Sequence, residues 1–328
     1  MLILSKIIRK NALFCGVFLC LFSVVGTAIL AEPTNDPETV EIDFKREAGQ
    51  TYVLEHYQEK DVGRGSRAVR VKMKTLIDVT VDKFGAEGIQ ITWTYRRPEI
   101  LEPQTDEMSP LTASILKMVE GMRFVIQINE SGGIQLINID EVKELSSRAI
   151  DRILEDEQFN EFTTQQKEQF RTVIRSMMSE EAISRDALEA FNAMYFLMAQ
   201  TWPIGTEVPM EASFPTMFGG EVSARGHVII KSVDGEKGVL NAFTQFNADP
   251  DEFEALMRQT FERLGKSLPA EIPELNMSET ANYLIDYEEG IVLELEYRRT
   301  VEVMNQKREQ LWRIRTLRDT SIQEARTE

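Results

Sequence analysis

The alternation of apolar and polar residues predicts long β-strands in the first third of the chain. Between Ser66 and Asp82 the residues alternate, with Thr75 and otherwise apolar side chains from Val69 to Val81 on one face, and the same alternation returns from Ile89 to Tyr95. A period of two residues places the apolar side chains on one face of a sheet and leaves the other face in contact with water. The stretch from Gly85 to Gly88 separates the two segments, so we predict an antiparallel hairpin.

A short helix and a second hairpin are predicted next. Ser109 is a candidate N-cap with Pro110 at the first helical position, and this helix runs to about Gly121. Strands at 124–129 and 134–139 then flank Gly132 and Gly133, which allow the positive φ of a tight turn.

Residues 140–200 switch to a helical period. Thr163 and Gln166 have the spacing of a capping box. An apolar stripe follows at helical spacing, formed by Ile183, Ala187, Phe191, Met194 and Met198. We therefore predict a helical insert over this part of the chain.

Strands are predicted again after residue 206. One more helix is predicted among these strands. It starts at Asp249, the N-cap, with Pro250 at the first helical position. The predicted strands are 208–214, 221–233, 239–246, 280–288, 291–303 and a last one that carries Trp312 and Ile314.

The segments on either side of the insert follow the same order of strands, one capped helix and a glycine-turned hairpin. Local matches support the comparison, since Val81–Ile89 parallels Val233–Val239 and Ile128–Ile134 parallels Ile285–Ile291. Duplication and a chance likeness between glycine-turned hairpins both remain open.

The predicted fold class is α+β, with a large curved antiparallel sheet of half-barrel form and helices on one face. One β-rich domain spans 40–317, with halves 40–139 and 201–317, the insert 140–200 and a polar tail at 318–328.

The N-terminus has the layout of a secretory signal peptide. Basic residues precede an apolar run from Ala12 to Ala31, and small residues before Glu32 offer a cleavage site. An uncleaved membrane anchor is one alternative, because the run approaches the length of a membrane span. A lipid-modified Cys20 is another, since Val17–Cys20 has a faint likeness to a lipobox. We expect residues 1–31 to direct export to the periplasm or cell envelope, with 32–39 as a linker and membrane contact only through an uncleaved segment.

The composition of the chain narrows the range of possible functions. The formal net charge of −17 argues against general nucleic-acid binding, which requires clustered basic residues. Both cysteines, Cys15 and Cys20, lie inside the export segment, and the chain shows none of the common catalytic, nucleotide-binding or metal-binding motifs. The two histidines, His56 and His227, fall in predicted strands, where a local hydrogen-bond partner is expected more often than a catalytic or metal role. We expect no enzyme activity and no cofactor.

Methionines are dense in the insert and at the start of the second half. Flexible methionine side chains fill ordinary cores, and they also line adaptable apolar pockets. The candidate ligand-binding residues are Met177, Phe191, Met194, Met198 and Trp202.

Basic residues also cluster on two predicted strand faces. An anionic headgroup or cross-strand pairing with acids such as Glu294 and Glu296 would explain them. The first cluster is Arg64, Arg67, Arg70, Lys72 and Lys74, and the second is Arg298, Arg299, Arg308, Arg313 and Arg315.

The order of elements resembles that of uncharacterised exported bacterial domains of unknown function. Two segments carry this resemblance, namely Gly121–Phe124 before the first glycine hairpin and Trp202–Val208 before the second set of strands. More distantly, the order of elements resembles the half-barrel of periplasmic lipoprotein carriers of the LolA and LppX type. The resemblance implies a space between sheet and helices that holds a lipid or lipoprotein, and it assigns no functional residue.

These observations predict a non-enzymatic envelope protein that binds an apolar ligand, either a lipid or a lipoprotein, or an envelope partner protein. A hydrolase with paired carboxylates is one alternative, which requires two acids to converge in a cleft. A structural or assembly protein is the other, and it predicts an exposed apolar patch.

Overall fold

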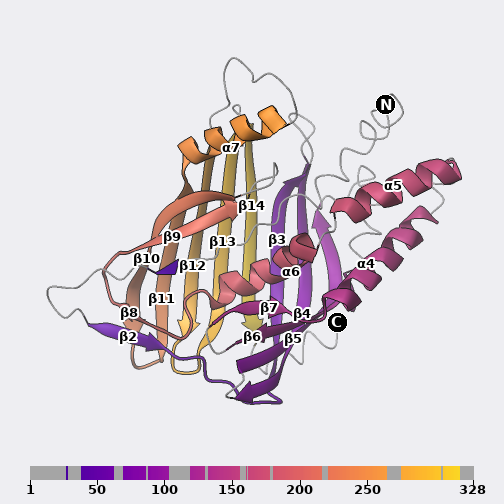
Figure 1. The fold of residues 1–328 in the computed structure, drawn as a ribbon. Coiled ribbons are helices and arrows are strands. Elements are labelled where there is room, and N and C mark those ends of the chain that lie inside the picture. The colour runs from indigo at the N-terminus through magenta and orange to yellow at the C-terminus, as the bar shows by residue number, and fades with distance from the viewer. Residues whose placement is uncertain are drawn as a thin grey trace.

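In the computed structural model, the backbone is described for residues 27–28, 38–62, 69–85, 88–102, 119–129, 132–155, 160, 162–177, 180–215, 221–263, 275–303 and 306–317. Most of this chain lies in antiparallel strands (Figure 1). The strands are β1 (Thr27–Ala28), β2 (Thr39–Ile42), β3 (Thr51–Val62), β4 (Val69–Gly85), β5 (Gly88–Glu102), β6 (Arg123–Ile128), β7 (Ile134–Leu136), β8 (Gln200–Pro203), β9 (Val208–Pro215), β10 (Glu221–Asp234), β11 (Val239–Ala248), β12 (Leu275–Asp286), β13 (Ile291–Val303) and β14 (Gln306–Leu317).

Twelve of the described strands form one sheet in the order β1-β9-β10-β11-β12-β13-β14-β3-β4-β5-β6-β7. The strands described in it pair antiparallel with their neighbours, and β7 and β1 lie at its two edges, so the described sheet is open. Figure 1 shows that it is also curved. This confirms the predicted fold class. The sequence did not indicate the small second sheet, in which β2 pairs with β8.

The two halves of the chain contribute matching blocks to the sheet. Strands β3 to β7 form one meander and strands β9 to β13 form another, and β14 pairs with β13 on one side and β3 on the other. The C-terminal strand therefore joins the two halves edge to edge. The strand order is what a duplication would give, and the duplication itself stays a prediction.

Alternating residues of each strand point to the inner face and build one continuous core. On β4 and β5, these residues include Ile77, Val79, Ile91 and Trp93, all fully buried. The β-branched and aromatic side chains suit such a pleated surface, where they pack against cross-strand neighbours. In the second half the buried positions include Phe214, Val222, Val228, Leu240, Ile285, Leu295, Trp312 and Ile314.

Four helices are described. They are α4 (Ile139–Leu154), α5 (Thr164–Met177), α6 (Glu180–Tyr195) and α7 (Pro250–Arg263). The predicted capping box is confirmed, because Thr163 N donates to Gln166 Oε1 over 2.8 Å and Gln166 N donates to Thr163 Oγ1 over 3.2 Å. The Asp249 cap is confirmed as well, since its Oδ1 accepts from the backbone N–H groups of Asp251 and Glu252.

The helices do not cover the sheet equally. Helix α6 lies against the inner face, α4 packs on α6, and α5 packs on α4 and extends away from the sheet (Figure 1). Helix α7 lies at one end of the strands, against β10 and β12. Of the predicted insert, α6 is therefore the helix that meets the curved face.

Some predicted elements have different bounds in the structure, and others lie outside the described residues. The strand expected at 134–139 ends at Leu136, because α4 already begins at Ile139. The carbonyl oxygen of Asn138 accepts a hydrogen bond from the N–H of Val142 in the first turn of that helix. The helix expected from Ser109 falls mostly outside the described residues, as do most of the export segment and the tail. No helix within the described ranges is long and apolar enough to cross a membrane.

The segment before β3 is held against the turn between β12 and β13. Arg46 Nη1 donates to the carbonyl oxygen of Glu289 over 2.7 Å, and its Nη2 donates to that of Gly290 over 2.6 Å. Gly290 has a φ of +62°, and a Cβ at this position would lie 1.8 Å from the carbonyl oxygen of Asp43. Only glycine allows this close approach of two backbones.

We expect Gly290→Ala to lower the free energy of unfolding by about 2–4 kcal/mol, because it adds a backbone clash to an unfavourable φ. Gly49→Ala is the matched control, since Gly49 has a φ of +88° and nothing within 4 Å of the added Cβ. That control should cost about 1 kcal/mol. Urea denaturation of both variants measures the difference, and equal losses would show that the contact with Asp43 does not form.

Candidate functional site

Helix α6 is anchored to both halves of the sheet by aromatic and hydrogen-bonded contacts. Phe191 packs on Trp93 of β5 with ring centroids 5.3 Å apart, and the Tyr195 hydroxyl lies 2.7 Å from that of Tyr52 on β3. On the other half, the Tyr283 hydroxyl of β12 donates to the carbonyl oxygen of Ala193 over 3.0 Å. The helix therefore has a defined position above the inner face.

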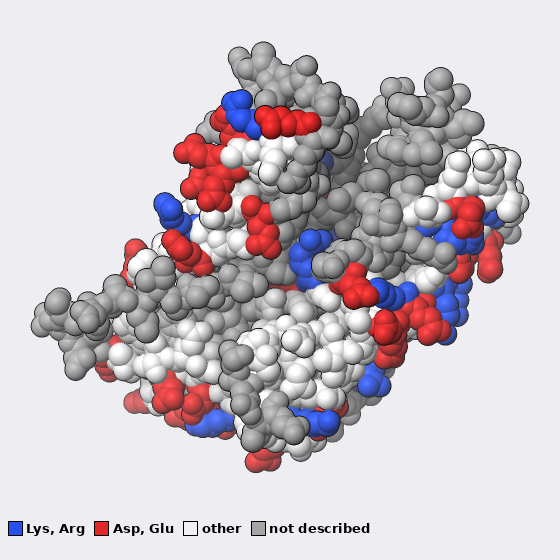
Figure 2. Space-filling model, in the orientation of Figure 1, with Lys and Arg blue, Asp and Glu red and all other residues white. Residues whose placement is uncertain are grey.

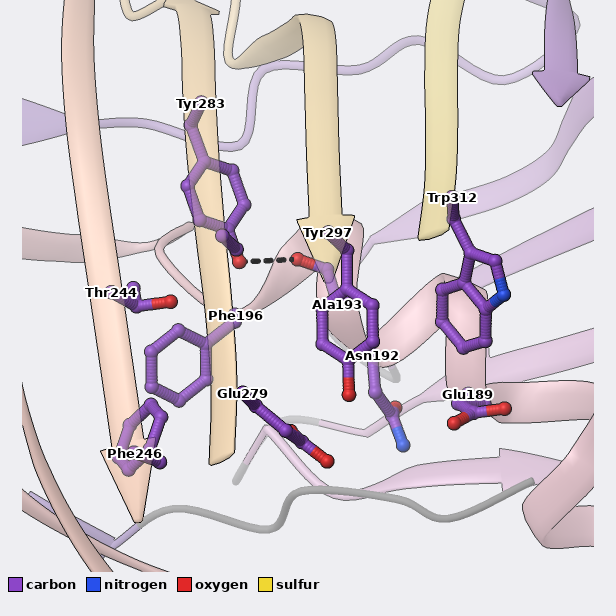
Figure 3. Close-up of a pocket in the computed structure, with 11 residues that line it drawn as sticks. Glu189, Asn192, Ala193, Phe196, Thr244, Phe246, Glu279, Tyr283, Tyr297 and Trp312 are labelled. Atoms are coloured by element: carbon purple, nitrogen blue, oxygen red, sulfur yellow. Dashed lines mark hydrogen bonds between the residues drawn. The ribbon is translucent and has the colours of Figure 1, made fainter. Parts of the chain in front are cut away.

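A pocket lies between the C-terminal half of α6 and strands β11 to β14 (Figure 3). It contains about 440 Å³ of empty space, part of which is open to solvent. Its walls combine aromatic and small apolar side chains with carboxylate, amide and hydroxyl groups. The lining residues are Glu189, Asn192, Ala193, Phe196, Thr244, Phe246, Glu279, Ala281, Tyr283, Tyr297 and Trp312.

The walls of the pocket place aromatic rings and polar groups next to one another. Phe196 and Phe246 meet edge to face with centroids 6.0 Å apart. Figure 3 shows these two rings on one side of the Glu279 carboxylate and Asn192 on the other. An occupant would therefore meet apolar and polar surface together.

Two buried carboxylates share one arginine beside this pocket. Arg299 on β13 contacts Glu189 on α6 with 3.0 Å between Nη1 and Oε1, and its Nε donates to Glu279 Oε1 on β12 over 2.6 Å. The three side chains are between 2 and 4% exposed. Cross-strand register places Glu279 directly opposite Arg299, so the sheet itself creates the Glu279 pair, and α6 adds Glu189.

Burial and charge act in opposite directions on this arginine. Burial alone would lower the pKa of Arg299, but the negative charges of Glu279 and Glu189 and the neighbouring Tyr297 raise it above its ordinary value. Burial also raises the pKa of Tyr297, with Arg299 opposing and the two carboxylates reinforcing the shift. The arginine is therefore charged and the tyrosine neutral across the physiological pH range.

Buried polar atoms without a hydrogen-bond partner among the described residues gather at this pocket. They include Glu279 Oε2, Asn192 Oδ1 and Trp312 Nε1. Such atoms are uncommon in native proteins because each one forfeits the hydrogen bond that it made to water. Figure 3 shows the indole nitrogen of Trp312 turned away from Tyr297, whereas Glu279 and Asn192 extend toward the same side of the pocket.

The residues predicted from sequence as ligand-binding lie elsewhere in the core. Phe191, Met194 and Met198 are at most 6% exposed and belong to the main apolar cluster. Trp202 is buried on β8, where its Nε1 donates to the carbonyl oxygen of Leu197 over 3.0 Å. None of these four lines the pocket, and the side chain of Met177 falls outside the described residues. Their role in binding stays a prediction.

The sequence contains a signal for the residues that do line the pocket. On β12, Glu279 occupies an inward position between Met277 and Ala281, and on β13 Arg299 follows Tyr297 in the same phase. A charged residue at a strand position where the alternation places apolar side chains indicates a buried charge, and a buried charge requires a partner. Arg299 therefore does not share a face with Arg298, because its position along β13 points it inward, where it pairs across the strands with Glu279.

The other described members of the two basic clusters mostly pair with acids on neighbouring strands. Arg70 lies 2.9 Å from Asp61 and Lys72 lies 2.8 Å from Glu102. Arg313 lies 2.9 Å from Glu296, and Arg315 contacts Glu294. Cross-strand pairing, one of the two explanations considered, is confirmed for these residues, while Arg64 and Arg67 fall outside the described residues.

The surface charge is mixed on the face drawn in Figure 2, where acidic side chains gather over α7. Helix α7 supplies Asp251, Glu252 and Glu254, all exposed. Within the described ranges, Phe84 and Ile137 are the large apolar side chains that are exposed, and no group of three or more His, Cys, Asp or Glu side chains is placed to hold a metal ion.

Compared with known protein families and with curated protein sequences, the chain matches none. The assignment of a function therefore depends on the fold and the pocket.

Proposed function

We propose that this chain is an exported, non-enzymatic protein of the cell envelope that binds a small amphiphilic molecule between α6 and the inner face of the sheet. The observation that carries the proposal is the pocket at α6, where unpartnered buried polar atoms lie beside aromatic side chains. A ligand with one polar and one apolar end would satisfy both kinds of wall.

The shape of the site supports an amphiphile over a fully polar metabolite. Phe246 and Ala281 on the strands and Phe196 just after α6 offer apolar surface, and an alkyl chain would gain about 25 cal/mol for each Å² that it buries there. The likeness to lipoprotein carriers points in the same direction, since those proteins use the space between a half-barrel and its helices.

The first test fills the pocket. Ala193→Leu places a larger side chain at the lining of the pocket while it keeps the backbone carbonyl that accepts from Tyr283. Ala255→Leu is the matched control, because Ala255 is an exposed alanine in α7. Native mass spectrometry of protein purified from its own host without detergent should show a bound mass on the wild type and on Ala255→Leu.

We expect the occupied fraction of Ala193→Leu to fall at least several-fold, because the added atoms take space that the ligand uses. Organic extraction of the bound mass then identifies its chemical class. A wild-type protein that carries no bound mass and takes up no amphiphile in solution would refute the proposal.

The paired-carboxylate hydrolase has one observation in its favour, since Glu189 and Glu279 converge at the pocket. Both acids contact the same buried arginine, whereas glycoside hydrolysis requires one acid kept protonated as a proton donor. Charge pairing accounts for this arrangement without a catalytic role, so we favour binding.

A further inference from the structure

The charges around the pocket indicate which kind of amphiphile fits it, if the chain binds one as proposed above. Two carboxylates, Glu189 and Glu279, face the single positive charge of Arg299. The register across the sheet runs from Arg299 to Gln310 on β14 and then to Lys60 on β3. One strand therefore lies between the two basic residues, and Lys60 does not line the pocket. The wall of the pocket itself therefore carries an excess of negative charge in a region with little access to water.

The free acceptor atoms point to the same chemistry. Both contacts of Arg299 with Glu279 use Oε1, which leaves Oε2 of a side chain only 2% exposed without a partner. Asn192 Oδ1, on the facing helix, is a second buried acceptor without a partner. Two free acceptors and a negative charge match an ammonium group, which donates up to three hydrogen bonds and accepts none.

From this juxtaposition we infer that the pocket selects amphiphiles with a protonated primary amine at the polar end, which Glu279 and Asn192 bind. The alkyl part of the ligand lies along Phe196 and Phe246. The proposal gives a reason for Glu279, whose Oε2 lacks a partner on the inner face of the sheet. A neutral residue at this position would carry a smaller desolvation penalty.

The test compares three probes of equal chain length and different charge, namely decylamine, decanol and decanoate, by isothermal titration calorimetry. The full chain is titrated at pH 7 with each probe below the concentration at which it forms micelles. Decylamine should bind roughly tenfold or more tightly than decanol, since a buried charge-assisted hydrogen bond contributes that much. Decanoate should bind more weakly than decanol.

The variant Glu279→Gln removes the charge and keeps an oxygen that can accept from Arg299. We expect the preference for decylamine over decanol to fall to about one, with decanol binding retained as proof that the pocket is intact. Glu294→Gln is the control on the outer face of β13, where the Glu294 side chain is 60% exposed, and it should keep the preference.

The outcomes separate this inference from the proposed function. Equal affinity of the wild type for decylamine and decanol, or tightest binding of decanoate, would overturn the amine assignment and leave amphiphile binding in place. Binding of none of the three probes would overturn both. The comparison of probes on the wild type decides the matter even if Glu279→Gln does not fold.

Discussion

Replacement of Arg299 by methionine should lower the free energy of unfolding by about 3–5 kcal/mol, the largest effect that we expect from any single substitution in this protein. The substitution leaves Glu189 and Glu279 buried without the positive charge that both contact. Removal of one partner from a buried ion pair costs more than the pair contributes, because the remaining charge keeps its desolvation penalty.

The neighbouring arginine is the matched control. Arg298 points to the opposite face of β13, its side chain is 45% exposed, and it lies 3.7 Å from Glu296. Arg298→Met should change stability by less than about 1 kcal/mol, because exposed ion pairs contribute little. Chemical denaturation of both variants provides the measurement.

A combined variant tests the cause of the loss. Arg299→Met together with Glu189→Leu and Glu279→Met removes all three charges, and it should recover most of the lost stability. If Arg299→Met alone were as stable as Arg298→Met, the two carboxylates would not be buried as the structure places them.

The second large effect concerns pH. Burial lowers the pKa of His56 to about 4, against an ordinary value of 6.5. His56 lies on the inner face of β3, where Trp312 meets it edge to face at 6.2 Å and the Gln58 side-chain nitrogen lies 3.3 Å from its Nε2. In that contact the unprotonated Nε2 of the neutral imidazole accepts a hydrogen bond from the Gln58 amide N–H, so protonation of Nε2 would remove the bond.

The sign of the pH dependence follows from linkage. Between pH 6.5 and 4 the unfolded chain binds a proton at this histidine and the folded chain does not, so acidification favours the unfolded state. The contribution of His56 is fully present above pH 6.5 and is lost as the pH falls to 4, by about 3 kcal/mol in total.

The measurement is the free energy of unfolding as a function of pH for the wild type and for His56→Gln. The variant should lose less stability than the wild type between pH 6.5 and 4, by about 3 kcal/mol, while carboxylates contribute equally to both. His227→Gln removes the other histidine of the chain, on β10, as the control. Parallel curves for the wild type and His56→Gln would show that His56 titrates normally.

Local pattern was sufficient for most of the secondary structure. The alternation along β4 and β5, the capping box at Thr163 and the Asp249 cap each depend on neighbours a few residues away. The predicted stripe is also confirmed, since Ile183, Ala187, Phe191 and Met194 are buried on α6 and Met198 is buried in the turn that follows it. Such features are visible in sequence because a period of 2 or 3.6 residues is a local property.

The candidate site could not be predicted in the same way. Methionine density led to Met194 and Met198, which pack in the core, while the pocket is lined by Asn192 of α6 and by Phe196, which directly follows that helix. Residues three or four apart on a helix share a face, so composition alone could not separate these neighbouring faces.

The sequence by itself determined the class of fold, because alternating apolar residues, glycine turns and helix caps fix the elements and the face that each one buries. Tertiary structure alone decided that β14 joins the two halves, that α6 is the helix placed over the inner face, and that Glu189, Glu279 and Arg299 meet beside one pocket. Glu279 and Arg299 come from the consecutive strands β12 and β13, whereas Glu189 comes from α6, far from both in the chain. Their contact depends on strand register and on the seating of the helix, which are set by packing over the whole sheet.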